Sequence, residues 1–404
     1  MRILFLTQWF DPEPTPKGFL FVKKLCELGH TVEVLTAIPN YPYGKYYEGY
    51  KFKFFQQELL DGLRVIRVPI YPSHDKSALK RALTYSTFSF FAFFYGVFAT
   101  KKADLIYAYH PPNAGFVAAL LSLFKRIPFV HDIQDLWPDS FVSTGMINNN
   151  ILLATINLFC NWIYKRAAVL IVISPGFKKE LIRRKVPKEK IEVIYNWCDE
   201  SKITMPKDLL DNPIVDNGKF NILFAGNMGS AQNLVLVLEA AEILMDTKPE
   251  IQFNFVGAGL ELEFLKKFAI TKQILNVKFI PRLPMDQIGA LLVSADVLLV
   301  HLKLDPLFSI TIPSKIQAYL AIGKPILNTV AGDAADIIKR SEAGIVALPG
   351  NVSSLVEACE SFLQMDQNQL LTMGSNGRNY YYNNLSLDEG VRNIDKIFQE
   401  VISL

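Results

Sequence analysis

The chain has 404 residues, half of them apolar, and this length exceeds what a single hydrophobic core normally serves, so two domains of roughly 200 residues are expected. The overall charge is nearly balanced, but residues 1–198 carry 25 basic and 15 acidic side chains and leave 17 and 24 for the remainder. A cationic first half that is rich in Phe and Tyr favours a lipid surface over nucleic acid as its partner.

The cysteines and the first residues bear on the compartment. Cys26, Cys160, Cys198 and Cys359 lack metal-binding or redox spacing, which is typical of reduced thiols in a cytoplasmic protein. The opening MRILFLTQWFDPEP has one basic residue and an apolar run too short for a signal-peptide core, and it suits a buried strand. The sequence therefore predicts a protein that stays in the cytoplasm.

Short apolar runs alternate with helical patterns along the first half, as in βαβ units that build a parallel sheet. The first such unit is a strand, a loop that contains Gly18, a helix and a second strand. The elements expected in this half are the helix 19–29 and the strands 2–7, 31–37, 105–110, 128–133, 169–174 and 190–199.

A second series of the same kind follows after a polar stretch. Residues 200–219 are rich in turn formers and have no clear periodicity, which is typical of a linker. The later strands are expected at 220–229, 251–259, 277–283, 295–302, 324–330 and 343–349. We therefore expect an α/β protein of two doubly wound domains, 1–199 and 220–385, with a C-terminal helix at about 386–404 that packs back on the first domain.

Several motifs resemble one known family. GNMGSAQNLVLVLEAAEIL, FNFVGAGLELEFLKKFA, IPSKIQAYLAIGKPIL and AGDAADIIKRSEAGIVA resemble, in order and spacing, the donor domain of the family-four glycosyltransferases. GHTVEVLT, YHPPNAGF, VHDIQDLWPDS and VISPGFKKEL resemble the subgroup that includes bacterial L-fucosamine transferases (WbuB-like) of O-antigen and capsule synthesis. The resemblance implies the GT-B fold, with two Rossmann-like domains facing across a cleft.

The same resemblance implies a nucleotide-sugar donor that binds in the second domain. Relatives hold the donor phosphates with an Arg and a Lys in the loop after the first strand, where this chain has the uncharged Asn227 and Gln232. The cations expected nearby are Lys315, in the IPSK motif with Ser314, and Arg282. For Lys315 the alternative is a solvated residue at a helix start.

Other donor contacts are expected around this loop. Two Glu residues of typical relatives are replaced by Ser309 and Gln317, and an amide at position 317 still has a donor and an acceptor for ribose hydroxyls. His301, at a strand end, is assigned to the donor site or to a structural role. In the first domain, Gly18 is grouped with the donor-binding residues.

A second cluster is expected at strand ends in the first domain. HPPNA resembles a segment whose His contacts the donor sugar, which points to His110. HDIQDLWPD places His131, Asp132, Asp135 and Asp139 within nine residues, a density hard to explain as core. Either Asp132 or Asp135 is expected to orient or deprotonate an acceptor hydroxyl. A metal cluster is the rival reading, but the resemblance implies no metal and no cofactor.

The implied reaction is sugar transfer with retention at the anomeric carbon, to a polyprenyl-diphosphate-linked saccharide. The subgroup suggests UDP-linked N-acetyl-L-fucosamine or another 6-deoxy sugar, and a GDP-linked donor stays open. A sugar-nucleotide 2-epimerase has the same fold but no use for a lipid-facing surface. A dinucleotide-dependent oxidoreductase needs a G-x-G-x-x-G turn, of which FVGAGLE has only a part.

Residues 82–100 are 19 uncharged positions rich in Phe, a length that could span a bilayer as a helix. Basic residues flank both ends, and the next strand must rejoin the same sheet, so a span is excluded. The alternatives are a buried helix and a helix with one aromatic stripe on the domain (Phe88, Phe91, Tyr95, Phe98) and another in the membrane (Phe90, Phe93, Phe94, Val97). The second alternative places the protein on the cytoplasmic face of the inner membrane, with Phe90, Phe94, Lys80 and Arg81 as contacts and the helix 151–166 beside them.

Overall fold

The computed structural model describes residues 1–404 except 75–76, 144–148, 201–202, 204–217 and 404. Most of the predicted linker 200–219 therefore lies outside the described residues. The chain forms two compact units, of which the first contains Met1–Tyr195 and Leu387–Leu404 and the second Asn196–Ser386.

An eight-stranded sheet with the order β3-β4-β2-β1-β5-β6-β7-β8 forms the centre of the first unit. All neighbouring pairs are parallel except β3 and β4. The strands are β1 (Arg2–Thr7), β2 (Thr31–Ala37), β3 (Gln56–Leu60), β4 (Leu63–Val68), β5 (Leu105–Tyr109), β6 (Phe129–Ile133), β7 (Val169–Val172) and β8 (Ile191–Val193). Helices cover both faces of the parallel strands, which explains why these strands are continuous apolar runs in the sequence.

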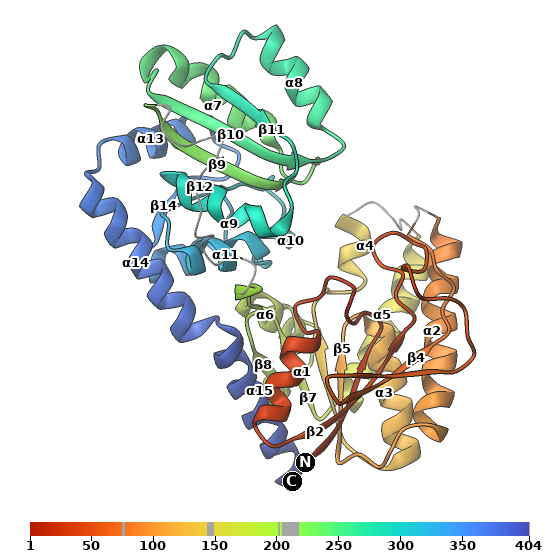
Figure 1. Ribbon diagram of the computed structural model, residues 1–404. Coiled ribbons are helices and arrows are strands. Elements are labelled where there is room, and N and C mark those ends of the chain that lie inside the picture. Colours follow the sequence, from red (N-terminus) through yellow and green to blue (C-terminus); the bar gives the residue numbers. More distant parts are fainter. Residues whose placement is uncertain (75–76, 144–148, 201–202, 204–217, 404) are drawn as a thin grey trace. The chain divides into compact units, whose positions relative to one another are not determined.

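Helices cover both faces of this sheet (Figure 1). One layer holds α2 (Ala78–Phe98), α3 (Pro112–Lys125) and α5 (Asn150–Arg166), and the other holds α1 (Phe19–Glu27) and α15 (Leu387–Ser403). The remaining helices are α4 (Asp139–Ser143), α6 (Pro175–Arg183) and the short 3-10 helix η1 (Lys188–Lys190).

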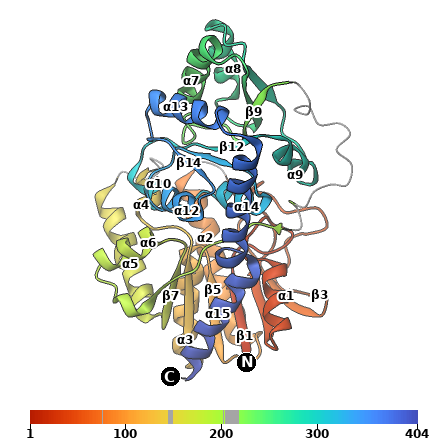
Figure 2. The same cartoon turned by 90° about the vertical axis from the view of Figure 1, so that its left-hand side faces the viewer.

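The C-terminal helix α15 lies beside α1, over the strands of the first unit (Figure 2). The Phe398 ring packs edge-on against Tyr107 of β5 with centroids 5.2 Å apart. His30 Nε2 lies 2.7 Å from Asp395 Oδ1, and Lys24 Nζ lies 3.0 Å from Asp388 Oδ1. A segment remote in sequence thus completes the surface of the first sheet.

The second unit has a six-stranded parallel sheet with the order β11-β10-β9-β12-β13-β14. Its strands are β9 (Phe220–Asn227), β10 (Ile251–Ala258), β11 (Val277–Ile280), β12 (Val297–Val300), β13 (Ile326–Asn328) and β14 (Gly344–Val346). Its helices are α7 (Leu234–Thr247), α8 (Leu262–Thr271), α9 (Met285–Ser294), α10 (Pro306–Ser309), α11 (Ser314–Ile322), α12 (Asp333–Ser341), α13 (Val352–Leu363) and α14 (Gln367–Asn384). All six strands fall within ranges expected from the sequence.

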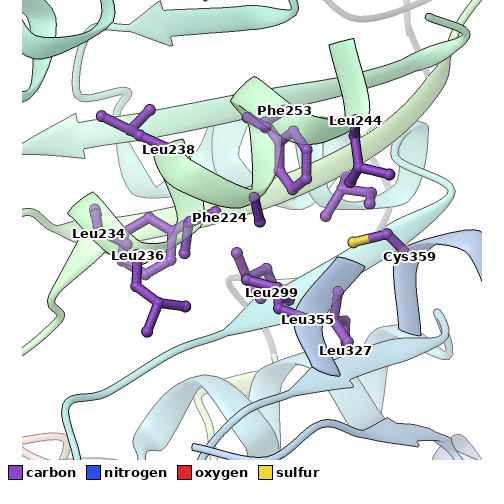
Figure 3. Close-up of a cluster of buried hydrophobic side chains, with 14 of the residues drawn as sticks. Phe224, Leu234, Leu236, Leu238, Leu244, Phe253, Leu299, Leu327, Leu355 and Cys359 are labelled. Carbon is purple, nitrogen blue, oxygen red and sulfur yellow. The ribbon is translucent and has the colours of Figure 1, made fainter. Parts of the chain in front are cut away.

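The core of the second unit joins α7 and α13 to one face of this sheet. Leu238 and Leu244 of α7 meet Phe253 and Leu299 of the strands, and Leu355 of α13 closes the cluster (Figure 3). Burying a Leu or Phe side chain contributes about 1.5–3 kcal/mol, so this cluster stabilises the packing of α7 and α13 on the sheet.

Candidate functional site

In the second unit, the chain runs outward in opposite directions from the neighbouring strands β9 and β12. Ligands of open α/β sheets bind in the crevice that such a switch point creates at the carboxyl ends of the strands. Asn227 is the last residue of β9, and His301 directly follows β12. Two predicted donor-binding residues therefore sit where the topology creates a ligand site.

Gln232 connects these two strand ends. Its main-chain oxygen lies 2.6 Å from His301 Nδ1, and its side-chain oxygen accepts a hydrogen bond from the Gly229 amide at 3.1 Å. The Asn227 side-chain amide donates to the same oxygen at 3.5 Å. Asn227 and Gln232, which stand where relatives have Arg and Lys, thus form hydrogen bonds within the loop after β9.

The His301 ring is a neutral hydrogen-bond acceptor. Burial, together with the nearby Lys315, lowers its pKa to about 4. Because Nδ1 faces a carbonyl oxygen, Nδ1 carries the proton, and Nε2 keeps its lone pair. Nε2 is buried and, among the described residues, has no partner. This atom is suited to accept a hydrogen bond from a ligand hydroxyl.

Lys315 brings an ammonium group into the same site. Its Nζ lies 3.3 Å from the centroid of the Phe224 ring, and a Cβ on Gly226 would stand 2.7 Å from its Cε. Gly226 also has a φ of 143°, so glycine at this position gives both the turn and the space. Within the described part of the chain no carboxylate pairs with this group, and burial lowers its pKa to about 7. An anion placed here would restore its charge.

The other predicted donor residues divide between two places. Ser314 and Lys315 lie in the first turn of α11. Gln317 is buried, and its side-chain nitrogen donates hydrogen bonds to the main-chain oxygens of Pro313 and Ser314. Arg282, in contrast, follows the edge strand β11, two strands away from β9, and is exposed. The structure therefore groups Asn227, Gln232, His301, Ser314, Lys315 and Gln317 around α11 and the switch point, without Arg282.

The first unit has its own switch point, between β1 and β5. His110 directly follows β5, and its Nε2 lies 3.3 Å from Asp135 Oδ2. Its ring centroid is 5.2 Å from that of Trp9, which in turn stacks on Tyr41 at 4.6 Å. Burial lowers the pKa of His110, and Asp135 partly offsets this. His110 is therefore a neutral imidazole held between a carboxylate and an aromatic pair.

Asp132 differs from Asp135, because its side chain is fully buried. It forms an ion pair with the buried Lys17 and accepts hydrogen bonds from Tyr107 and Gln134. Asp132 is thus enclosed in the core, whereas the Asp135 side chain is 52% exposed. Lys17 was not anticipated, since no spacing in the sequence marks a lysine that will pair inside the core.

The other two members of this ionisable cluster also have structural places. His131 is buried, with Nδ1 3.2 Å from the Ala108 oxygen, and burial lowers its pKa to about 4. Asp139 forms an ion pair with Arg184. The expectation that all four groups lie outside the core is wrong for His131 and Asp132, because both belong to β6 and point into the unit.

Gly18 is the residue before α1. A Cβ at this position would stand 2.2 Å from Asp11 Oδ2, and the same oxygen accepts the Phe19 amide at 2.6 Å. The carboxylate therefore caps the helix, and glycine makes room for it. A donor group bound at this amide would therefore compete with the cap.

Helix α2 exposes part of its aromatic surface. Phe90 and Phe94 are 58% and 42% exposed, whereas Phe88 and Ala92 are buried against the unit. Phe98, predicted to pack on the domain, is 79% exposed, because the buried line follows every fourth residue from Thr84 to Gly96. Lys80 is exposed and Arg81 partly buried. Among the described residues, no helix combines the length and apolar character needed to cross a membrane.

Comparison with known families gives two matches along the chain. Residues 20–197 match the glycosyl transferase 4-like domain, and residues 209–380 match the glycosyl transferases group 1 family. The two matches follow each other with a short gap and together take in most of both units.

Two curated relatives are similar over much of their length. WcaI of Escherichia coli (strain K12), provisionally named a colanic acid biosynthesis glycosyl transferase, is 29% identical over 349 residues, which are 80% of this chain and 82% of WcaI. WbjE of Pseudomonas aeruginosa, provisionally named a glycosyltransferase, is 26% identical over 255 residues, which are 61% of this chain and 62% of WbjE. The latter match thus spans less than two thirds of the relative.

Solved structures resemble the chain over nearly its full length. Anabaena Alr3699/HepE in complex with UDP has a TM-score of 0.71 at 18% identity and covers 99% of this chain and 100% of its own. Sucrose-phosphate synthase from Thermosynechococcus elongatus has a TM-score of 0.72 at 17% identity, covering 100% and 99%. These likenesses show the fold, and they confirm the predicted GT-B class with two Rossmann-like domains.

Proposed function

We propose that this chain, a glycosyltransferase built from a glycosyl transferase 4-like domain and a glycosyl transferases group 1 domain, moves a sugar from a nucleotide donor to a lipid-linked saccharide. The observation that carries the proposal is the Lys315 ammonium, which lies at the switch point of the second unit with no carboxylate paired to it in the described chain. The diphosphate of a nucleotide donor would be the anionic partner of this ammonium group.

The donor is proposed to be UDP-linked. Anabaena Alr3699/HepE has been solved with UDP and with UDP-glucose, which supports this base at a site of the same fold. The resemblance to L-fucosamine transferases points to N-acetyl-L-fucosamine or another 6-deoxy sugar, and GDP is the alternative base. Gln317 is proposed to bind the ribose through its carbonyl oxygen, and His301 to accept a donor hydroxyl at Nε2.

The acceptor is proposed to be a polyprenyl-diphosphate-linked saccharide of surface polysaccharide synthesis. The name of WcaI, which refers to colanic acid, supports this class. The exposed Phe90 and Phe94 of α2 support attachment to the cytoplasmic face of the inner membrane, where such an acceptor is embedded. Lys80 and Arg81, in the first turns of the same helix, favour anionic lipid.

The chemistry proposed is transfer with retention and without a metal, as the family resemblance implies. Lys315 stabilises the leaving diphosphate, and binding energy positions the reactants. The H-x-P-N-A motif assigns to His110 a contact with the donor sugar. Asp135 is the exposed carboxylate beside it and is proposed to orient the acceptor hydroxyl or accept its proton.

A transfer assay tests this proposal. The protein is incubated with a panel of UDP- and GDP-sugars and a lipid-diphosphate-linked saccharide, and the lipid product is analysed by mass. Extension of the lipid by one sugar is the expected result. Conversion of the nucleotide sugar into its 2-epimer with no lipid product would show an epimerase, and no turnover with any donor would contradict both.

A further inference from the structure

Two hollows of the first unit meet at Tyr85 of α2. One is a polar pocket of about 180 Å³, and the other is an apolar groove of about 460 Å³. Tyr85 lines both of them, so the two hollows adjoin at this residue of α2.

The polar pocket lies next to His110. Trp9 and Tyr41, stacked on each other, form one wall, and Trp9 is the ring that approaches His110 at 5.2 Å. The His74 ring meets Tyr41 edge-on at 5.1 Å, and Arg81 brings a guanidinium to the pocket. Stacked aromatic rings with a cation beside them suit a sugar linked to phosphate.

The apolar groove runs between α2, α3 and α5. Its aromatic wall includes Phe90, Phe94, Phe116 and Phe159, with Phe90 and Phe94 centroids 4.8 Å apart and Phe116 and Phe159 centroids 4.9 Å apart. Side chains from three helices thus line a concave surface, which holds a narrow hydrocarbon chain better than a flat face does. At one end, Trp137 packs against Tyr85 at 5.4 Å.

A buried polar residue, Asn113, lies near the junction of the two hollows. Asn113 donates through Nδ2 to the Gln8 side chain at 2.9 Å and to the Tyr85 main-chain oxygen at 3.4 Å. Its Oδ1 is buried and, among the described residues, has no partner. Arg81 lies one helical turn before Tyr85, so a cation stands at the polar end of the groove.

We infer that the groove seats the first isoprene units of the acceptor lipid, with its diphosphate at Arg81 and its sugar in the pocket beside His110. The inference rests on the proposed function, and it adds a defined seat for the hydrocarbon to general attachment to a membrane. The order of the surfaces, from apolar to cationic to aromatic and polar, follows the order of the groups in a prenyl-diphosphate sugar. The charge at the junction has the sign that a diphosphate requires.

Prenyl diphosphates of increasing length test the seat without any membrane. Dimethylallyl, geranyl and farnesyl diphosphate are titrated into the full chain by calorimetry, in buffer free of lipid and detergent. Farnesyl diphosphate should bind at least about tenfold more tightly than the dimethylallyl compound, at one molecule per chain, because each added CH2 that leaves water favours binding. Equal affinities, or no binding, would overturn the inference.

Variants separate the groove from other apolar surface. Ser86→Trp fills the groove from an exposed position, and Phe94→Ser removes part of its wall, so both should abolish the gain with chain length. Phe98→Asp changes an exposed ring outside the groove lining and should leave the gain unchanged. If Phe98→Asp reduces the gain as much as the groove variants do, nonspecific apolar contact explains it. The transfer assay fails separately if the proposed function itself is wrong.

Discussion

The Nε2 atom of His110 lies 3.3 Å from Oδ2 of Asp135, and the two residues come from the ends of neighbouring parallel strands, β5 and β6. The register that pairs Tyr109 with Asp132 carries both chains to the same edge of the sheet. The imidazole is thereby oriented by a carboxylate that is itself half exposed.

Asp135→Asn should lower turnover by about 100-fold, because proton transfer or orientation by a positioned carboxylate contributes on that order. UDP affinity should stay unchanged, since the residues proposed to bind UDP belong to the second unit. The measurements are kcat with the lipid-linked acceptor and calorimetry with UDP. Asp139→Asn, four residues further on, removes a carboxylate paired with Arg184 and serves as the control. Equal losses of turnover in both variants would refute the role of Asp135.

The affinity for UDP should fall as the pH rises above 7. The pKa of Lys315 is lowered to about 7, so at higher pH the free protein holds a neutral amine that must take up a proton when the diphosphate binds. The loss is at most about tenfold per pH unit. Titrations between pH 7.5 and 9.5, above the second ionisation of phosphate near about 6, measure it.

Lys315→Met should weaken UDP binding at pH 7 and flatten this pH dependence. Arg282→Ala removes an exposed cation of the same unit and should change neither. A folded Lys315→Met protein with the wild-type affinity and slope would contradict the proposed contact between Lys315 and the diphosphate.

Glu13 should make stability depend on pH. Its buried carboxyl accepts the amides of Phe10, Asn40 and Tyr41, and burial raises its pKa to about 7. The folded protein therefore holds a proton that the unfolded chain releases above about 4.5. The stability that this proton contributes is present below that pH and is lost as the pH rises through 7.

Between pH 5 and 8 the wild type should thus lose roughly 1–3 kcal/mol of unfolding free energy relative to Glu13→Gln, whose side chain does not ionise. Urea unfolding at both pH values, followed by tryptophan fluorescence in a Trp197→Phe background so that the remaining tryptophans all lie in the first unit, measures the difference. Glu27→Gln, at an exposed position of α1, is the matched control. Parallel pH dependence of the wild type and Glu13→Gln would disprove the linkage.

Phe90→Asp combined with Phe94→Asp should release the protein from anionic liposomes in flotation. Each Phe withdrawn from the membrane removes about 1.5–3 kcal/mol of burial, and each new carboxylate adds repulsion. UDP binding should persist, because these residues lie on α2 of the first unit. Leu260→Asp, at an apolar position 93% exposed in the second unit, should float as the wild type does. A double variant that still floats, or that loses its fold, would show that the membrane interpretation is wrong.

The sequence predicted the sheet of the second unit well, because buried parallel strands are continuous apolar runs between turns. It missed the β3–β4 hairpin, although Asp61 and Gly62, with φ values of 46° and 83°, form the Asp-Gly turn that favours such hairpins. The polar residues of β3 concealed that strand, since an edge strand needs no apolar run on both faces.

Site residues were predicted less evenly. The positions of His110 and His301 directly after a strand were predicted, because strand ends can be read from the sequence. Asp132 and Asp135 are not distinguished by composition, and only the three-dimensional structure shows that Lys17 and Tyr107 occupy the former. Whether such a carboxylate is buried or exposed depends on neighbours that are distant in sequence.

Helix α15 has a consequence for the order in which the protein folds during synthesis. It packs on α1 and β5 of the first unit, yet the ribosome makes it after every residue of the second unit. The second unit can therefore complete its fold while Tyr107 still lacks Phe398 as its neighbour. A nascent chain arrested before residue 387 should expose the α1 side of the first sheet to chaperones, and residues 387–404 supplied as a separate peptide should protect it.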